Sequence, residues 1–253
     1  MAARRSPECS PQRSGERSEA GRAGATDGAW LLREAMRRVL ADAAASLARQ
    51  GFASREILLL DIGGRGRPYA EIFSRELGGG GARVRHLVLD AGSQADVTAR
   101  AERLPIAAAS VDLVLCTQVL EHVQDPSAAV SEMARVLKPD GACLLTTHGT
   151  WFYHPDPEDY WRWTPAGLAL LFQEGGFHRT TVQPVGGTKL ALASLVLTSL
   201  ERAAGEGAAG GLLRRLLVAP ANLLASAWLM RGVTGRACVS GELAINYLVT
   251  ARR

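Results

Sequence analysis

The sequence has few cysteines and no arrangement of them that suggests a disulfide framework. Four stand in 253 residues, none in a C-x-x-C spacing, and Cys116 and Cys143 lie in apolar runs typical of buried positions. No signal-peptide pattern opens the chain, because the arginines near its start have no apolar segment behind them. The basic residues are scattered rather than interleaved with aromatics, so we expect no nucleic-acid partner. Together these features predict a cytoplasmic protein.

Large apolar side chains are nearly missing from residues 1–26, which predicts a disordered tail. The remainder, 27–253, has the length of one domain with a helical insertion at about 189–235. No apolar run within that insertion is long and uninterrupted enough to span a bilayer. Two alternatives stay open for residues 190–230: two helices that pack on the domain, or an amphipathic pair in peripheral contact with a membrane surface.

Strand-like and helix-like patterns alternate along the chain. The expected strands are 57–60, 84–89, 96–99, 111–116, 142–147, 180–185 and 242–251. The expected helices are 29–50, 70–77, 127–137 and 165–174, and 138–141 is expected to form a turn. Strands separated by helices predict an α/β fold, with a mostly parallel seven-stranded sheet and helices on both faces.

A glycine-rich turn follows the first expected strand and is the first sign of a ligand site. Asp61 ends the apolar run, and Gly63, Gly64 and Gly66 follow, where small residues let the backbone approach a ligand. The dinucleotide pattern G-x-G-x-x-G fails, because its last position is Tyr69. Asp61 instead begins a D-x-G pattern. The alternative is a glycine turn that binds no ligand.

Asp90 follows the second expected strand directly. A carboxylate at this place can accept hydrogen bonds from both hydroxyls of a ribose, as expected of a nucleoside-binding α/β fold. Its alternative role is that of a turn or helix-capping aspartate.

Three further runs carry a resemblance to a known family: A-E-R-L-P-I at 101–106, S-V-D-L-V at 110–114 and Q-V-L-E-H-V-Q-D-P at 118–126. With the D-x-G opening, they resemble the type-11 group of class I S-adenosylmethionine (SAM)-dependent methyltransferases. The resemblance implies the Rossmann-like fold of that class and SAM as cofactor.

The same resemblance implies roles for particular residues. The turn of Ala101 and Glu102 would face the adenine, and Thr117 and Gln118 would flank the methionine part of SAM. The glycine turn would pass close to the cofactor. The chain departs from the family pattern at three arginines: Arg65 and Arg67 replace glycines, and Arg100 replaces an acidic residue. Residues 118–122 have the alternative role of shaping a loop only.

Aromatic and ionisable side chains crowd into residues 148–165, after the fifth expected strand. This run resembles the H-P-x-D-Y-x-R-x-T-P-x-G-L loop of methyltransferases linked to bacterial cell-surface glycans. The predicted acceptor-binding residues are Trp151, Tyr153, Tyr160 and Arg162, and the candidate proton acceptors are His148, His154 and Asp159. In the alternative, the rings only wedge the loop onto the next helix. We expect no metal, because the spacing of His148, His154 and Asp156 fits no rigid helical pair of ligands.

The sequence thus predicts a SAM-dependent methyltransferase acting on a small-molecule or glycan acceptor, at oxygen. One alternative is a lipid-like or quinone-type acceptor at a membrane surface. Another is a non-catalytic SAM-binding protein, which the three arginine substitutions favour. The acceptor, the methylated atom and the oligomeric state do not follow from the sequence.

Overall fold

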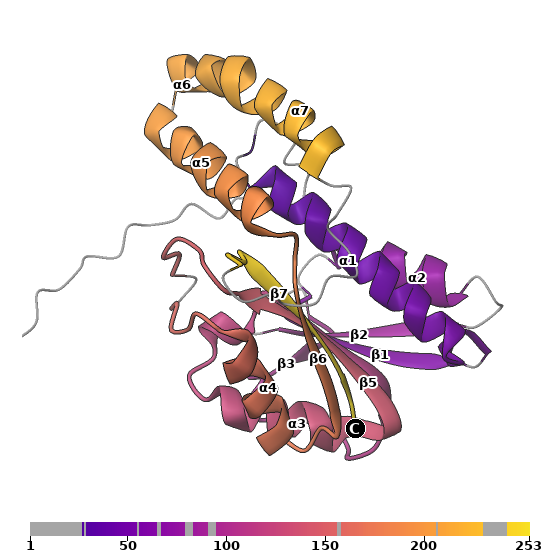
Figure 1. Ribbon diagram of the computed structural model, residues 1–253. Helices are drawn as coiled ribbons and strands as arrows, with labels where there is room; N and C mark the ends of the chain where they lie inside the picture. Colours follow the sequence, from indigo (N-terminus) through magenta and orange to yellow (C-terminus); the bar gives the residue numbers. More distant parts are fainter. Residues whose placement is uncertain are drawn as a thin grey trace, which may run out of the picture.

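A seven-stranded sheet with helices on both faces forms the body of the molecule (Figure 1). The computed structural model describes residues 27, 29–54, 56–64, 67–78, 83–90, 95–155, 158–205, 207–229 and 242–253. The predicted disordered tail, 1–26, lies outside the described residues, as does the end of the predicted insertion, 230–235.

The sheet has the strand order β3-β2-β1-β4-β5-β7-β6. All pairs are parallel except those of β7, which runs antiparallel to β5 and β6. The fold class predicted from the sequence is confirmed. The strands are β1 (Ile57–Ile62), β2 (Val84–Asp90), β3 (Val97–Thr98), β4 (Val111–Thr117), β5 (Leu137–His148), β6 (Arg179–Pro184) and β7 (Asn246–Arg252).

The central strands are apolar on both faces because helices cover both sides. In β1, Leu59 belongs to the core on one face, whereas Leu60 and Ile62 belong to the core on the other. Every residue of β4 is buried. Such continuous apolar strands are typical of a parallel sheet covered on two sides.

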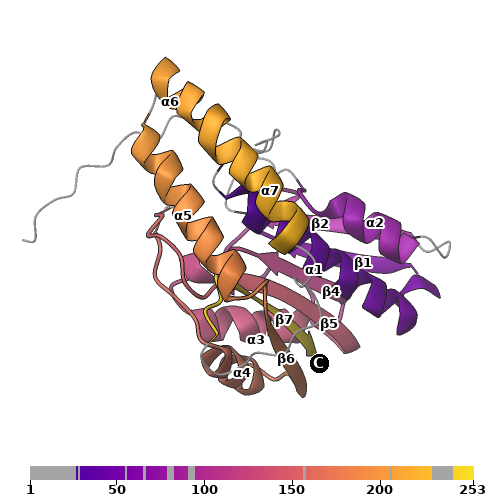
Figure 2. The ribbon, with the colours of Figure 1, turned by 45° about the horizontal axis from the view of Figure 1, so that its top comes forward.

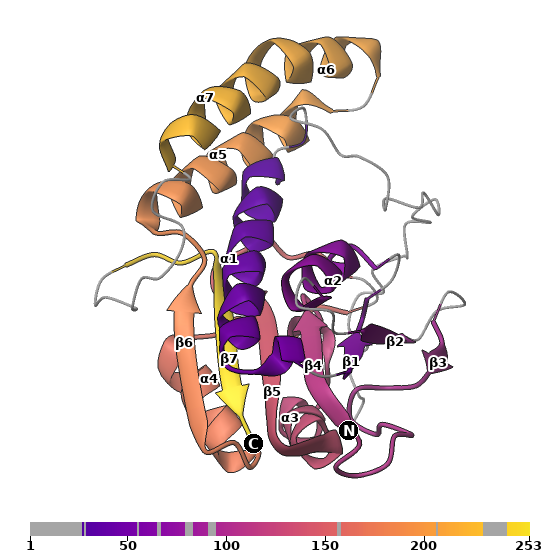
Figure 3. The same cartoon turned by 90° about the vertical axis from the view of Figure 1, so that its right-hand side faces the viewer.

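Two helices lie on each face of the sheet. On one face, α1 (Trp30–Arg49) packs against α2 (Ala70–Gly78) and lies lengthwise over the sheet (Figure 3). On the other, α3 (Pro126–Val136) packs against α4 (Pro165–Glu174). The side chains of Asp125 and Thr164 accept hydrogen bonds from backbone N–H groups in the first turns of α3 and α4. These caps, each followed by proline, fix where the two helices begin. Short 3-10 turns are η1 (Phe52–Ser54) and η2 (Leu120–His122).

Two sequence-based boundaries were wrong. Residues 138–141, expected as a turn, lie within β5, where the register moves from Val111 opposite Leu137 to Leu113 opposite Ala142. The extra residues bulge out of the ladder, with Asp140 at φ 63°. The last strand begins at Asn246 rather than at position 242, because the backbone before it pairs with the segment that follows β5.

The predicted insertion forms a helical hairpin that extends from the sheet beyond α1 (Figures 1 and 2). Its first arm is α5 (Thr188–Ala204), and its second is α6 (Ala208–Leu213), the π-helical turn η3 (Arg214–Val218) and α7 (Ala219–Leu229). Both arms contact α1. Among the described residues, no helix has the length and apolarity needed to cross a membrane.

Candidate active site

The turn after β1 is built so that only glycine fits at two positions. Gly63 has φ +74°, and a Cβ there would lie 2.2 Å from Cγ2 of Val119. A Cβ on Gly64 would lie 2.3 Å from the carboxyl carbon of Asp61. The backbone of this turn therefore packs directly onto the strand end and its aspartate.

Asp61 is buried at this strand end, with 1% of its surface exposed. Neither carboxylate oxygen has a hydrogen-bond partner among the described residues. Burial raises the pKa of Asp61 to about 7, against a smaller opposing effect of the Arg67 guanidinium. A buried carboxylate without a donor is costly, so the site is suited to a ligand that brings a cationic or hydrogen-bond-donating group.

The other predicted cofactor residues lie at the same edge of the sheet. Ile62 of β1 pairs with Leu89 of β2 and with Cys116 of β4, so the three strands end side by side. Thr117 is the last residue of β4 and is buried. Gln118 follows it with φ 55°. Gly66 and the side chain of Asp90 lie outside what the structure describes.

Arg100 does not lie over this edge as a free charge. Its guanidinium pairs with Glu102 at 2.8 Å, and its side chain is two-thirds exposed. The adjacent Ala101 is buried in the core that contains Val114 and Cys116. The Gln118 amide nitrogen donates to Oγ1 of Thr146 at 3.2 Å, which turns this predicted cofactor residue toward β5.

The aromatic loop after β5 is tied to η2 by several hydrogen bonds. The backbone N–H of Tyr160 donates to the carbonyl of Glu121 at 2.8 Å, and the indole Nε1 of Trp161 donates to the carbonyl of Val123 at 2.7 Å. The ring of His122 contacts the carbonyl of Glu158. Loop and η2 thus form one unit beside the cofactor edge.

An ion pair inside the loop fixes its shape. The Arg162 guanidinium binds both carboxylate oxygens of Asp159, at 2.6 and 2.5 Å, and also donates to the carbonyls of Phe152 and Trp151. The hydrogen bonds from Arg162 hold the pKa of Asp159 well below its usual range. The sequence predicted Arg162 to bind the acceptor and Asp159 to accept its proton. The geometry favours a structural role for the pair, with Asp159 accepting from the backbone N–H of His154 at 3.0 Å.

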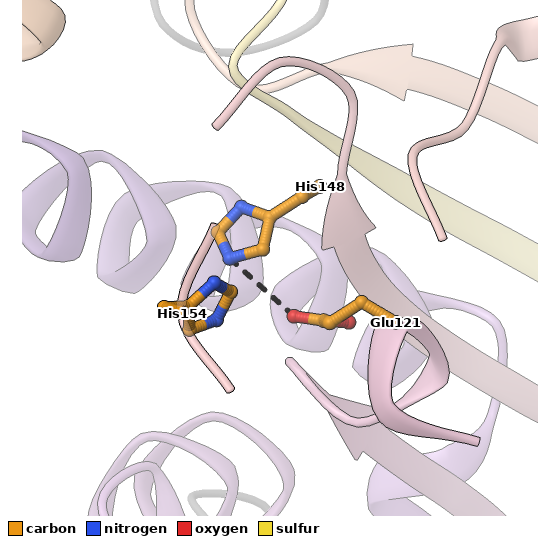
Figure 4. A group of neighbouring side chains, drawn as sticks. All are labelled: Glu121, His148 and His154. Atoms are coloured by element: carbon orange, nitrogen blue, oxygen red, sulfur yellow. Dashed lines mark ion pairs between the residues drawn. The ribbon is translucent and has the colours of Figure 1, made fainter. Parts of the chain in front are cut away.

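Glu121, His148 and His154 point toward one another (Figure 4). They come from η2, the end of β5 and the aromatic loop. Each offers a ligand atom, and the three atoms lie within 4.8 Å of one another. Nε2 of His148 lies 3.4 Å from Oε1 of Glu121, and Oγ1 of Thr147 donates to Oε2 at 2.9 Å. Oε1 has no hydrogen-bond partner within the part of the chain that the structure describes.

Burial governs the protonation of this cluster. It lowers the pKa of His148 to about 3 and lowers the pKa of His154 less, while it raises the pKa of Glu121. Both imidazoles are therefore neutral near pH 7. Nδ1 of His154 lies 3.1 Å from the carbonyl oxygen of Phe152 and 3.3 Å from Asp159. The ring proton belongs on Nδ1, and the lone pair of His154 is on Nε2.

The predicted acceptor-binding aromatics differ in exposure. Trp151 stacks on His148, with ring centroids 5.6 Å apart and planes 8° from parallel. Tyr153 is 67% exposed. The hydroxyl of Tyr160 accepts a hydrogen bond from Gln124 at 3.0 Å. The guanidinium of Arg202, on α5, lies 4.5 Å from the ring centroid of Phe152, so the hairpin reaches the loop.

Sequence reasoning missed two residues of this cluster. Glu121 lies in the Q-V-L-E-H run but was given no role, although a carboxylate before a histidine was a usable signal. Asn246 carried no signal, because it stands on the last strand. Its amide nitrogen, in the orientation that satisfies the neighbouring carbonyls, donates to Nδ1 of His148 at 2.7 Å. That hydrogen bond places the other ring proton of His148 on Nε2, toward Glu121.

A family model described as a methyltransferase domain matches residues 45–145. This stretch contains the glycine turn and the ends of β1, β2 and β4. The match thus covers the stretch in which the sequence motifs indicated a methyltransferase.

Curated relatives match parts of the chain. The ubiquinone biosynthesis O-methyltransferase of Psychrobacter cryohalolentis is 27% identical over 130 residues, 47% of this chain and 50% of that protein. The malonyl-[acyl-carrier protein] O-methyltransferase of Methylovorus sp. is 45% identical over 53 residues, 21% of this chain and 18% of that protein. The chain thus spans half or less of the length of these relatives.

One solved structure resembles most of the chain. The candidate sarcosine dimethylglycine methyltransferase of Galdieria sulphuraria superposes with a TM-score of 0.52, at 16% identity, over 84% of each chain. At this identity the likeness concerns the fold, which is the Rossmann-like methyltransferase fold.

Proposed function

We propose that the protein transfers a methyl group from SAM to an oxygen atom of a small-molecule or glycan acceptor. The buried Asp61 beneath the glycine turn is the observation that carries this proposal, because its carboxylate has no hydrogen-bond donor among the described residues and a cofactor ammonium group would supply one. The two curated relatives named above are O-methyltransferases by name, which favours oxygen.

The residues fit SAM at the edge formed by β1, β2 and β4. Asp61, Gly63 and Gly64 would hold the amino-acid part, Asp90 the ribose hydroxyls, and the turn at Ala101 and Glu102 the adenine. Bound SAM supplies a methyl group on a sulfonium, which is already a good leaving group. The protein's contribution is then mainly alignment, since orienting two reactants can remove about 7–11 kcal/mol of a barrier.

The aromatic loop would hold the acceptor. Trp151 is fixed by stacking on His148, and the exposed Tyr153 is free to cover a bound ring or sugar. An oxygen acceptor must lose its proton, and we assign that task to the cluster of Glu121, His148 and His154. His154 is the more accessible of the two histidines, with 31% of its side chain exposed against 5% for His148.

Two measurements test the proposal together. Calorimetry should show SAM binding to the wild type and a large loss of affinity in Asp90→Ala; unchanged affinity would mean that the ribose contact is misplaced. Incubation with methyl-labelled SAM and fractionated cell extract should label a polar fraction. SAM binding without any labelling would instead favour the non-catalytic alternative.

A lipid-like acceptor at a membrane surface is the second candidate. Leu192, Val196 and Leu200 are exposed on α5 at intervals of four residues, and further leucines are exposed on the second arm: Leu212, Leu213, Leu216, Leu217, Leu223 and Leu224. The contact of Arg202 with Phe152 would link this apolar surface to the acceptor loop. Labelling of the lipid fraction, in place of the polar one, would favour this candidate.

A further inference from the structure

We propose that Glu121, His148 and His154 form a binding site for a divalent cation of the zinc type. The inference deepens the proposed function, because the cation would lie where the acceptor's proton is lost. Its binding to the protein does not depend on methyl transfer. The spacing of His148, His154 and Asp156 predicted no metal, whereas the cluster in the structure pairs the two histidines with Glu121.

The spacing of the donor atoms suits a tetrahedral cation. Two ligands on bonds of about 2.1 Å and at tetrahedral angles lie about 3.4 Å apart. Nε2 of His148 and Oε1 of Glu121 are 3.4 Å apart. The third ligand comes from His154, within 4.8 Å of both. This residue is half-buried on the loop after β5, and cation binding would require its side chain to move toward the other two.

Oε1 of Glu121 is a second, independent sign of a missing ligand. Glu121 is fully buried, and its other oxygen already accepts from Thr147 at 2.9 Å. Among the described residues Oε1 accepts no hydrogen bond, and the nearest donor, Nε2 of His148, lies at 3.4 Å without making one. Leaving a buried carboxylate oxygen unsatisfied is costly, and a cation held by the two imidazoles would remove that cost.

The surrounding groups resemble the outer shell of a metal site. Metal-binding histidines usually donate their second ring N–H to a carbonyl or carboxylate, which fixes the ring. Nδ1 of His154 has both partners, the carbonyl of Phe152 at 3.1 Å and the carboxylate of Asp159 at 3.3 Å. The nearby positive charge of Arg162 is neutralised by its paired contacts to Asp159, so it opposes the cation little.

Nδ1 of His148 faces the side-chain amide of Asn246. A cation on Nε2 requires the ring proton on Nδ1, and hence an amide turned to present its oxygen. Cation binding is therefore coupled to the orientation of Asn246. The carbonyls of Ile245 and Thr147 oppose that orientation, because they accept hydrogen bonds from the amide nitrogen as it stands.

The donor set selects the cation. Two imidazoles and one carboxylate with an open fourth position are typical of catalytic zinc sites, whereas Mg²⁺ prefers oxygen ligands only. The open position would take the acceptor oxygen. A bound cation lowers the pKa of such an oxygen strongly, so the acceptor would lose its proton to solvent water, and Glu121, His148 and His154 would act as ligands rather than as proton acceptors.

The test measures binding of ZnCl₂ and CoCl₂ to the full-length protein without SAM. We expect one Zn²⁺ per chain by chelator competition, visible d–d absorption of four- or five-coordinate Co²⁺, and no comparable affinity for Mg²⁺. His154→Gln and Glu121→Gln should lower Zn²⁺ affinity beyond the roughly tenfold to hundredfold typical of losing an outer-shell partner.

His178→Gln is the matched control, because it removes an exposed imidazole whose backbone pairs with Arg252, at the end of β7 opposite to Asn246, and it should leave Zn²⁺ affinity unchanged. Circular dichroism and SAM calorimetry on each variant separate a lost metal site from a lost fold or a wrong function. Equal Zn²⁺ affinity of wild type, His154→Gln and Glu121→Gln, all folded, would overturn the proposal. So would a Co²⁺ spectrum typical of six oxygen ligands.

Discussion

At the residue scale, Asp61 shows how burial without a hydrogen-bond donor raises the pKa of a carboxyl group. It is the second-last residue of β1, its carboxylate has no hydrogen-bond donor among the described residues, and burial raises its pKa to about 7. The sequence predicted its place beside a ligand. Its protonation depends on the surrounding core, on Gly64 above it and on the distance of the charged Arg67, and none of these can be read from spacing along the chain.

The first prediction concerns the pH dependence of stability. Folded Asp61 has a pKa of about 7 against 3.8 for the unperturbed group, so the folded state keeps a proton that the unfolded state releases between these values. The unfolding free energy should therefore fall as pH rises from about 4 to about 7. The slope should be at most about 1.4 kcal/mol per pH unit. Urea unfolding at several pH values should show this slope in the wild type.

Asp61→Asn has no proton to lose and serves as the reference for that experiment. The difference in stability between wild type and variant should shrink toward low pH. A difference that is constant across the range would show that Asp61 ionises normally.

The second prediction concerns Gly64. A methyl group at this position would meet the Asp61 carboxyl at 2.3 Å, so Gly64→Ala should cost about 1–3 kcal/mol through overpacking and should weaken SAM binding. Gly78→Ala is the matched control, since a Cβ there would have no neighbour within 4 Å. Urea unfolding and SAM calorimetry compare the two. Equal stability of both variants would mean that the turn is not tightly packed.

The loop after β5 is the informative feature at the scale of elements. Its sequence indicated an acceptor-binding segment, and its aromatic residues do lie beside η2. The Arg162 guanidinium donates its hydrogen bonds to Asp159 and to backbone carbonyls within the loop. We therefore interpret this pair as the support of the loop.

Weakening that support should expose the loop. Arg162→Lys keeps the charge but loses the paired hydrogen bonds to Asp159, and one charged hydrogen bond contributes about 1.5–3 kcal/mol. Chymotrypsin should then cleave within residues 151–160 at least roughly tenfold faster, because local opening becomes easier. Arg179→Lys, an exposed arginine on β6, is the control. Identical cleavage rates in the two variants would argue against a supporting role.

At the scale of the whole molecule, the hairpin of α5 to α7 exposes leucines that do not pack against the sheet. The arms contact α1 on one side, and many of their leucines are exposed. Arg214 and Arg215 lie on the same arm as six of these leucines. Apolar side chains flanked by arginine suit the surface of an anionic membrane.

The prediction at this scale is cosedimentation with phosphatidylglycerol vesicles. Full burial of a leucine side chain contributes about 1.5–3 kcal/mol, and burial at a membrane surface is only partial. Removing two such side chains in the double variant Leu216→Ser, Leu224→Ser should therefore reduce vesicle binding roughly tenfold or more. Leu170→Ser, which changes an exposed leucine on α4, should bind like the wild type. Wild-type protein that stays in the supernatant would exclude the membrane-surface candidate.

The sequence by itself determined the α/β class, the approximate strands and the glycine turn, because apolar periodicity and glycine act over a few neighbouring residues. It also indicated the methyltransferase-domain family through motifs within 61–126. The tertiary structure alone decided which ionisable groups meet. Glu121, His148, His154 and Asn246 come from four separate segments, and only the packing of η2, β5, the loop and β7 around one buried volume brings them together and sets their protonation.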